Sequence, residues 1–225
     1  MPEYTLHTYF RSSCSARLRI ALDHKDLPWE ARHVNLLKGE QHSDAHRALN
    51  PSCSVPLLVV NNPNDDTPPF AIGQSLAALE YLEEAHPETT PLLPPASSPR
   101  RRAAARALAA IIACDIQPVT NLRIMKRVRA FDGASAEDWN RDLMTEGLAA
   151  YEALARDSAG AYSVGDDLTL ADACLAPALW NAQRFGVDLA AFPTISRIMR
   201  NLEEHPAVIK AHWKNQPDTP EDLRK

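Results

Sequence analysis

The chain has 225 residues, of which 45% are hydrophobic, 24% charged and 6% aromatic, and its formal net charge is −5 at pH 7. This length accommodates one large or two modest domains with a sizeable core. A weakly acidic chain with few aromatic residues argues against nucleic-acid binding. No uninterrupted apolar run approaches the roughly eighteen residues of a membrane span, so we expect none. The N-terminal sequence MPEYTLHTYF also lacks the basic and apolar regions of a signal peptide.

The cysteines lie far apart, at Cys14, Cys53, Cys114 and Cys174. They form neither a CxxC motif nor a Cys/His pattern with metal-ligand spacing. We therefore expect no metal site, and we interpret these residues as reduced thiols of a cytoplasmic protein.

The first part of the chain alternates between strand and helix patterns. Strands are predicted at residues 4–9, 29–35, 57–60 and 70–72, and helices at 14–24, 44–49 and 76–85. Residues 61–69, rich in Asn, Asp and Pro, predict a turn. This order, β-α-β followed by β-β-α, is compatible with an α/β thioredoxin-like domain over residues 1–88.

The second part is expected to be all-helical. Residues 89–99 form a Pro-rich linker, the end of the segment PETTPLLPPASSP. Helices are predicted near residues 100–129, 136–157, 170–185 and 194–204, within an all-helical domain over residues 100–225. The polar tail from Gln216 onward is expected to be loosely held.

The most informative motif is SSCSARLRIAL at residues 12–22, where a strand turns into a helix. A helix N-terminus has unpaired amide groups and about half a positive charge, so it favours an anion such as phosphate, carboxylate or thiolate. The motif has no Gly-rich loop for phosphate, and the hydroxyls of Ser12 and Ser13 suit a thiolate. Alternatively, Ser12 is only the N-cap of the helix.

The energetics of thiol ionisation are within reach of such a motif. A thiol with a pKa of about 8.5 is only about 3% ionised at pH 7, and lowering that pKa by two units takes about 2.7 kcal/mol. A helix N-terminus supplies about 0.3–1 kcal/mol, and a hydrogen bond to a charged acceptor about 1.5–3 kcal/mol. The argument applies equally to Cys14 and to the thiol of a bound ligand.

Several motifs together resemble zeta-class glutathione transferases: SSCSARLRIAL, VNLLKGEQ (34–41), NPSCSVP (50–56), GQSLAALEYLEE (73–84), IQPVTNL (116–122), YSVGDDLTLADACLAPALWNAQRFGVDL (162–189) and QPDTPEDLR (216–224). The resemblance implies the glutathione transferase fold, with glutathione as cofactor and a cytoplasmic homodimer. It further implies cis–trans isomerisation of a small dicarboxylate, maleylacetoacetate to fumarylacetoacetate, in tyrosine and phenylalanine catabolism. Glutathione transfer to small haloacids is an expected side activity.

The resemblance also assigns site residues. Ser13 is expected to donate to the glutathione thiol, with Ser12 and Cys14 assisting. Further glutathione contacts are implied at Ser15, Arg17, Gln41, Val55, Pro56, Gln74, Ser75, Gln117, Asn121, Leu122 and Arg123. The Val55–Pro56 bond is cis in the resembled fold, which leaves the Val55 backbone free to pair with a peptide. Arg17 and Arg184 are the expected partners of substrate carboxylates.

Some of these positions have a second interpretation from the residues themselves. Gln74 and Ser75 begin a helix, so Ser75 can bind a carboxylate or act as a cap. Arg184 near a helix end can cap carbonyls or pair with an acid instead of binding substrate. The family carries a small polar residue at the position of Arg123, so the role of this arginine stays open.

Two local patterns bear on the helices. Pro118 removes a hydrogen bond to the Cys114 carbonyl and predicts a kink, and Asn121 lies one turn beyond Gln117, so both are predicted to face one cleft. The sequence TLAD at residues 169–172 predicts a capping box, a folding feature rather than a catalytic one.

Other functions remain open at this point. Maleylpyruvate isomerase or a general glutathione transferase would differ in substrate, whereas a thiol-disulfide reductase would form a stable mixed disulfide at Cys14. A non-catalytic scaffold domain is a further alternative, but it has no need of a thiolate-stabilising motif.

Overall fold

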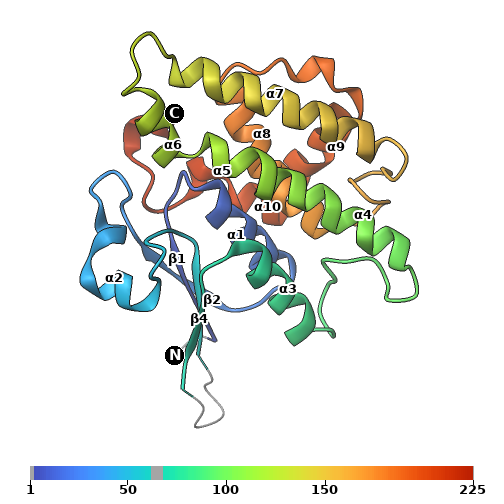
Figure 1. Cartoon of the computed structure of the whole chain (residues 1–225). Coiled ribbons are helices and arrows are strands. Elements are labelled where there is room, and N and C mark those ends of the chain that lie inside the picture. Colours follow the sequence, from blue (N-terminus) through green and yellow to red (C-terminus); the bar gives the residue numbers. More distant parts are fainter. Residues whose placement is uncertain (1–2, 62–67, 225) are drawn as a thin grey trace. The chain divides into compact units, whose positions relative to one another are not determined.

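The computed structural model describes residues 3–61 and 68–224, which form two compact units (Figure 1). The first, residues 1–91 with 206–225, contains β1 Tyr4–Thr8, α1 Ser13–His24, β2 Trp29–His33, α2 Asp44–Leu49, β3 Leu57–Val60, β4 Phe70–Ile72, α3 Ser75–Ala85 and α10 Pro206–Ala211. The second, residues 92–205, contains α4 Pro99–Ala110, α5 Gln117–Thr120, α6 Leu122–Val128, α7 Ala136–Ala155, α8 Leu170–Arg184 and α9 Pro193–Glu204. Most of the turn expected at 61–69 lies outside the described residues.

The first unit is built on a four-stranded sheet in the order β2-β1-β3-β4. Strand β1 pairs in parallel with β2 and antiparallel with β3, so that Leu6 lies opposite both Ala31 and Leu58. The central position of β1 buries it, and Leu6 has no exposed surface. Helix α1 packs against both α3 and α10 (Figure 1). The expected thioredoxin-like arrangement is confirmed.

The C-terminal segment differs from expectation. The structure groups residues 206–225 with the sheet unit, not with the helical domain predicted over 100–225. Gln216 and Thr219 are buried, so the expectation of a loose tail is wrong. Polar composition was misleading because these side chains bond to nearby carbonyls, as Gln216 Nε2 does to Lys210 O at 2.8 Å. Trp213 and Leu223 also pack on a buried cluster of the sheet unit, formed by Tyr9, Phe10, Val34 and Val55.

The helix predicted over residues 100–129 is interrupted. A π-helical turn over Ile111–Ile116 precedes Pro118, and the extended backbone of Asn121, with ψ 166°, separates α5 from α6. Helix α7 satisfies the carbonyls exposed by this break: Trp139 Nε1 donates to Val119 O and Asn140 Nδ2 to Thr120 O, each at 2.9 Å. Proline alone predicts a kink, whereas the complete break depends on these distant donors.

The predicted linker is partly incorporated into the helical unit. The boundary between the two units falls after Pro91, and Leu92 and Leu93 are buried. Leu92 O accepts a hydrogen bond of 2.8 Å from Leu170 N at the start of α8. Beyond the linker, the described residues contain helices and two isolated β-bridges, in agreement with the expected all-helical region.

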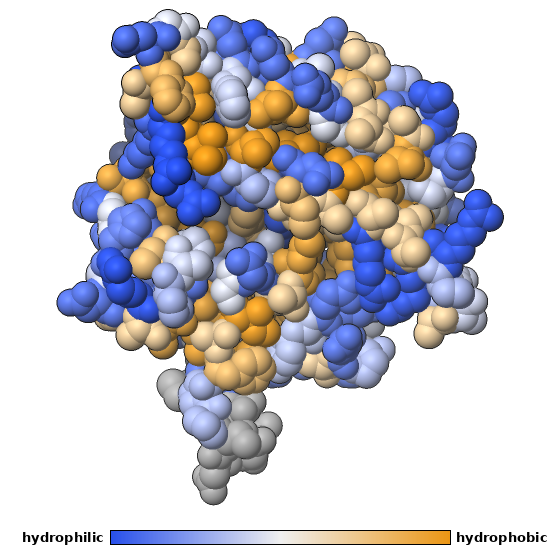
Figure 2. Space-filling view, viewed as in Figure 1, coloured by the Kyte–Doolittle hydropathy of each residue, from blue (hydrophilic) through white to orange (hydrophobic). Residues whose placement is uncertain are grey.

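One described stretch, Pro99–Val128, is long and apolar enough by length and composition to cross a membrane. This differs from the expectation of no such stretch because its many alanines raise the average hydropathy without forming a strongly apolar run. The core helices of soluble proteins share this composition. Figure 2 shows hydrophobic residues here interspersed with hydrophilic ones.

Candidate active site at the start of helix α1

The SSC motif lies where the sequence predicts it, at the N-terminus of α1. Ser12 is the N-cap: its amide donates to Tyr9 O at 2.9 Å, and its Oγ accepts from Ser15 N at 3.1 Å. Ser13 and Cys14 form the first turn and are half-buried, and no acidic residue lies in that turn. The positive end of α1 therefore retains its capacity for an external anion.

A second helix N-terminus is tied to the first. Arg17 is 2% exposed, and its Nη1 donates to Ser75 Oγ at 2.9 Å in the first turn of α3. Gln74, the N-cap of α3, is exposed. This burial places Arg17 to orient Ser75 and to add positive charge between the two helix starts. It does not favour the direct contact with a substrate carboxylate that the sequence suggested.

The loop before β3 has the expected cis peptide bond at Val55–Pro56. Its conformation is held by Asn50, whose Nδ2 donates to Ser54 O at 2.8 Å. A Cβ at Gly73 would lie 3.0 Å from Asn50 Oδ1, so glycine allows the loop to approach the start of α3 closely. Asn50 and Gly73 were not predicted as site residues, although both lie within quoted motifs.

A buried histidine pair supports the same loop. His46 Nε2 lies 3.0 Å from Ser54 O, and His46 Nδ1 lies 3.4 Å from His7 Nδ1. Burial, with the nearby charge of Arg32, lowers the pKa of His7 to about 4, so His7 is neutral at pH 7. The buried contact of the two rings beneath the loop is consistent with a structural role for the pair.

Gln41 carries an unused acceptor. It lies in the short helical turn Glu40–His42, and its buried Oε1 has no hydrogen-bond partner among the described residues. Because buried polar atoms almost always have a hydrogen-bond partner, this oxygen is available to a water molecule or to a donor on a ligand. The described residues contain no cluster of three or more His, Cys, Asp or Glu suited to a metal.

The remaining candidates lie in the helical unit. Asn121 does not share a helical face with Gln117 as predicted, because it interrupts the helix and caps α6, with Oδ1 accepting from Ile124 N at 3.1 Å. Leu122 begins α6, and Arg123 is exposed. Arg184 is exposed in the last turn of α8, its guanidinium 5.1 Å from the centre of the Phe185 ring.

Comparison with known proteins decides the family. Residues 11–85 match "Glutathione S-transferase, N-terminal domain" and residues 121–206 match "Glutathione S-transferase, C-terminal domain". The chain belongs to the glutathione S-transferase family. This transferase is 57% identical to a maleylacetoacetate isomerase of Aspergillus fumigatus over 224 residues, covering 99% of this chain and 96% of the relative.

Two solved structures resemble this transferase closely. One is maleylacetoacetate isomerase from Anaeromyxobacter dehalogenans with bound dicarboxyethyl glutathione and citrate, with a TM-score of 0.87 and 39% identity over 99% of this chain and 96% of that one. The other is a maleylpyruvate isomerase, a bacterial glutathione transferase of the zeta class. Its TM-score is 0.86 at 39% identity, over 96% of this chain and 100% of that one.

Proposed function

We propose that this transferase is a zeta-class maleylacetoacetate isomerase that uses glutathione as a cofactor. The observation that carries the proposal is the start of α1, where Ser12, Ser13 and Cys14 surround a helix N-terminus with no acid of its own. Similarity to proteins named for this activity supports it. Among the described residues, the buried acceptor of Gln41 and the exposed Gln74 at the N-terminus of α3 fit a peptide ligand with amide and carboxylate groups.

The chemistry that bound glutathione supplies is a thiolate that adds reversibly to the cis double bond, permits rotation about the resulting single bond, and leaves again. The task of Ser13 is to donate a hydrogen bond that favours the thiolate, with Ser12 and Cys14 assisting. Ser12 retains its hydroxyl proton for donation because its oxygen is the acceptor in the N-cap bond. Ser15 forms part of the same turn.

The other residues hold the cofactor and the substrate. The Val55 backbone beside Pro56 pairs with the peptide, while Gln74 and Ser75 receive its carboxylate, with Arg17 reinforcing Ser75. Gln117, Leu122 and Arg123 are proposed as further contacts from the helical unit. Asn121 contributes there by capping α6, and Arg184 binds a substrate carboxylate.

The cellular setting is proposed on the same resemblance. The protein acts in the cytoplasm as a homodimer, in tyrosine and phenylalanine catabolism. None of the four cysteines, all of which lie among the described residues, forms a disulfide, which is compatible with a reducing compartment. Light scattering coupled to size-exclusion chromatography measures the oligomeric state, and a mass of one chain would contradict the dimer.

A coupled assay of maleylacetoacetate with and without glutathione tests the activity. We expect fumarylacetoacetate only when glutathione is present, with no net consumption of glutathione. Conversion without glutathione would contradict the proposal. A stable mixed disulfide at Cys14 with no isomerisation would indicate a thiol-disulfide reductase instead.

A second candidate is isomerisation of maleylpyruvate, favoured by the TM-score of 0.86 to a maleylpyruvate isomerase, close to the 0.87 to the maleylacetoacetate isomerase. Both substrates need the same ionised thiol and differ only beyond the reacting double bond. Parallel measurements of kcat/KM on the two substrates decide between them, and a higher value for maleylpyruvate would select the second candidate.

A further inference from the structure

The guanidinium of Arg19, on α1, is buried in the sheet unit, with 1% of the residue exposed. It donates to Thr8 Oγ1 at 2.9 Å, to Tyr9 O at 3.4 Å and to Phe10 O at 3.2 Å. It also donates twice to Ala211 O, at 3.2 and 3.1 Å. A buried charge is tolerated only with such partners. Arg19 therefore joins the turn between β1 and α1 to the C-terminal segment.

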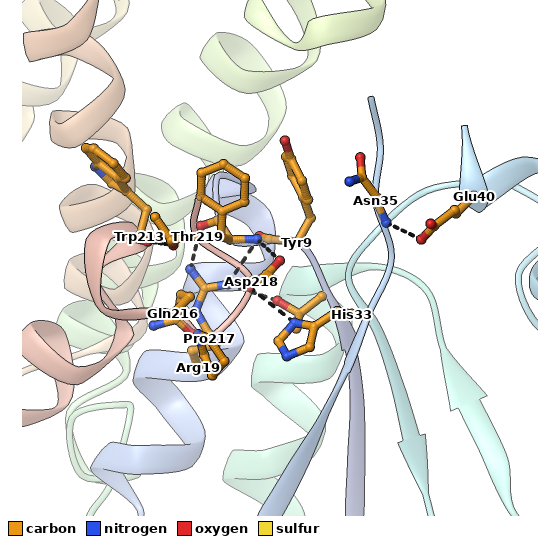
Figure 3. Close-up of polar contacts among 12 residues, drawn as sticks. Tyr9, Arg19, His33, Asn35, Glu40, Trp213, Gln216, Pro217, Asp218 and Thr219 are labelled. Atoms are coloured by element: carbon orange, nitrogen blue, oxygen red, sulfur yellow. Dashed lines mark hydrogen bonds and ion pairs between the residues drawn. The ribbon is translucent and has the colours of Figure 1, made fainter. Parts of the chain in front are cut away.

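Asp218 reaches the same turn from the end of the chain. Its Oδ2 accepts from Phe10 N at 2.8 Å, and its Oδ1 lies 3.2 Å from His33 Nδ1. Figure 3 shows Asp218 with Arg19 on one side and His33 on the other. Burial lowers the pKa of Arg19 to about 10, and the negative charge of Asp218 opposes that shift. Arg19 and Asp218 thus form one clamp on both sides of the Phe10 backbone, which we call the Arg19–Asp218 clamp.

The clamp holds the backbone that carries the SSC motif. Tyr9 O, an acceptor for Arg19, also accepts from Ser12 N at 2.9 Å. Ser12 in turn caps α1 through Ser15 N. A continuous series of hydrogen bonds therefore connects the C-terminal segment to the first turn of α1. A displacement of this turn by a few tenths of an ångström would misalign the hydroxyls of Ser12 and Ser13.

We propose that Arg19 and Asp218 are positioning residues for thiol ionisation, and that the C-terminal segment acts through them on the first turn of α1. The inference rests on the proposed function, because it assigns these residues to the glutathione thiol bound at that turn. It assigns to residues 216–219 a role in the reaction although they carry no reacting group. A merely structural anchor would change stability and leave the ionisation of bound thiol unchanged.

The test is an ultraviolet titration of the thiolate of glutathione bound to the full-length protein. Asp218→Asn keeps an acceptor for Phe10 N but removes the charge, whereas Asp218→Ala removes both. We expect the pKa of the bound thiol to rise by about one unit in Asp218→Ala, where the turn loses its anchor. In Asp218→Asn the hydrogen bond is kept and a negative charge is removed, which by itself favours the thiolate, so the pKa should not rise. At a pH at least one unit below the wild-type pKa of the bound thiol, where the thiolate fraction falls about tenfold per unit of pKa, kcat of Asp218→Ala should fall about tenfold, with a smaller change in KM.

Lys210→Gln is the matched control. Lys210 Nζ pairs with Asp23 Oδ1 at 2.7 Å, joining the same C-terminal segment to the other end of α1. Denaturant melts of each variant report its stability, and the thiol pKa of Lys210→Gln should match the wild type. If Asp218→Ala does not fold, Arg19→Lys, which keeps the positive charge with fewer hydrogen-bond donors, is compared with Lys210→Gln, and its thiol pKa should likewise rise.

The outcomes separate the clamp from the proposed function. An unchanged thiol pKa in folded Asp218→Ala, or in Arg19→Lys where it replaces that variant, together with an active wild-type enzyme, would overturn the positioning role of the clamp alone. An equal shift in Lys210→Gln would also overturn it, since general tethering would then explain the effect. Wild-type protein that does not ionise bound glutathione would overturn the proposed function and the clamp together.

Discussion

The first turns of α1 and α8 differ in the source of their negative partner. At α8 the chain supplies its own: Asp172 is fully buried, closes the capping box with Thr169, and also accepts from Ser163 N at 2.9 Å. At α1 the corresponding position, three residues after the N-cap, is Ser15, and the first turn has no acid. A helix N-terminus that is bonded to a carboxylate of its own chain stabilises the fold, whereas a helix N-terminus without such a carboxylate can bind an anionic ligand.

The largest expected effect is the loss of stability when Asp172, the carboxylate at the start of α8, is removed. Asp172 accepts three hydrogen bonds, from Ser163 N, Thr169 N and Thr169 Oγ1, at 2.8–2.9 Å. Asp172→Ala leaves these buried donors unsatisfied and should lower the free energy of unfolding by about 3–5 kcal/mol, more than the loss of an isolated cap. Denaturant melts measure it, at a protein concentration held constant.

Asp166→Ala provides the control for that variant. Asp166 is exposed and accepts one backbone hydrogen bond, from Ala161 N at 2.9 Å, so its removal should cost about 1 kcal/mol or less. Glutathione affinity of folded Asp172→Ala should equal that of the wild type. A large loss of glutathione affinity without loss of stability would place Asp172 in the glutathione site. The start of α8 would then bind a ligand, as we propose for the start of α1.

The same two helix starts show what could be predicted from sequence. The partners of Asp172 lie within nine residues of it, so TLAD alone predicts the capping box, as confirmed. The position of Ser12 as N-cap is equally local. Arg19, by contrast, bonds to a carbonyl 192 residues away, and neither spacing nor polarity indicates such a pair. Local motifs therefore predicted the two helix starts, while the buried C-terminal segment became visible only in the structure.

Introducing an acidic residue into the first turn of α1, as in α8, should weaken the proposed thiol site. Ser15→Asp places a carboxylate three residues after the N-cap, the spacing of Thr169 and Asp172. Its negative charge beside the thiolate should raise the pKa of bound thiol by about one unit or more and, at a pH below the wild-type pKa of that thiol, reduce turnover about tenfold or more. Ser15→Asn, of similar volume and uncharged, is the control. Equal effects of both variants would assign the loss to packing, since Ser15 is fully buried.

Removing the proposed donor itself tests the open start of α1 without adding a charge. Ser13→Ala should raise the pKa of bound glutathione thiol and reduce turnover about tenfold or more, because one hydrogen bond to a charged acceptor contributes about 1.5–3 kcal/mol. Cys14→Ala should have a smaller effect if Cys14 only assists. Ultraviolet titration of both variants decides: an unchanged titration in Ser13→Ala with an inactive Cys14→Ala would move the chemistry to Cys14.

The smallest expected effect is at the other end of α8, where Arg184 carries its charge on an exposed side chain. An exposed ion pair contributes about 1 kcal/mol or less, so Arg184→Ala should lower kcat/KM for maleylacetoacetate by at most about fivefold. The guanidinium also stacks on Phe185, 5.1 Å from the ring centre, and Arg184→Lys retains the charge with weaker stacking. A neutral electrophile should be conjugated at an unchanged rate by both variants, and glutathione affinity should be unchanged.

A loss of kcat/KM on the neutral substrate equal to that on the dicarboxylate would show that Arg184 stabilises the end of the helix and does not bind the substrate. Both ends of α8 would then serve the fold, and specificity for a dianion would have to come from elsewhere.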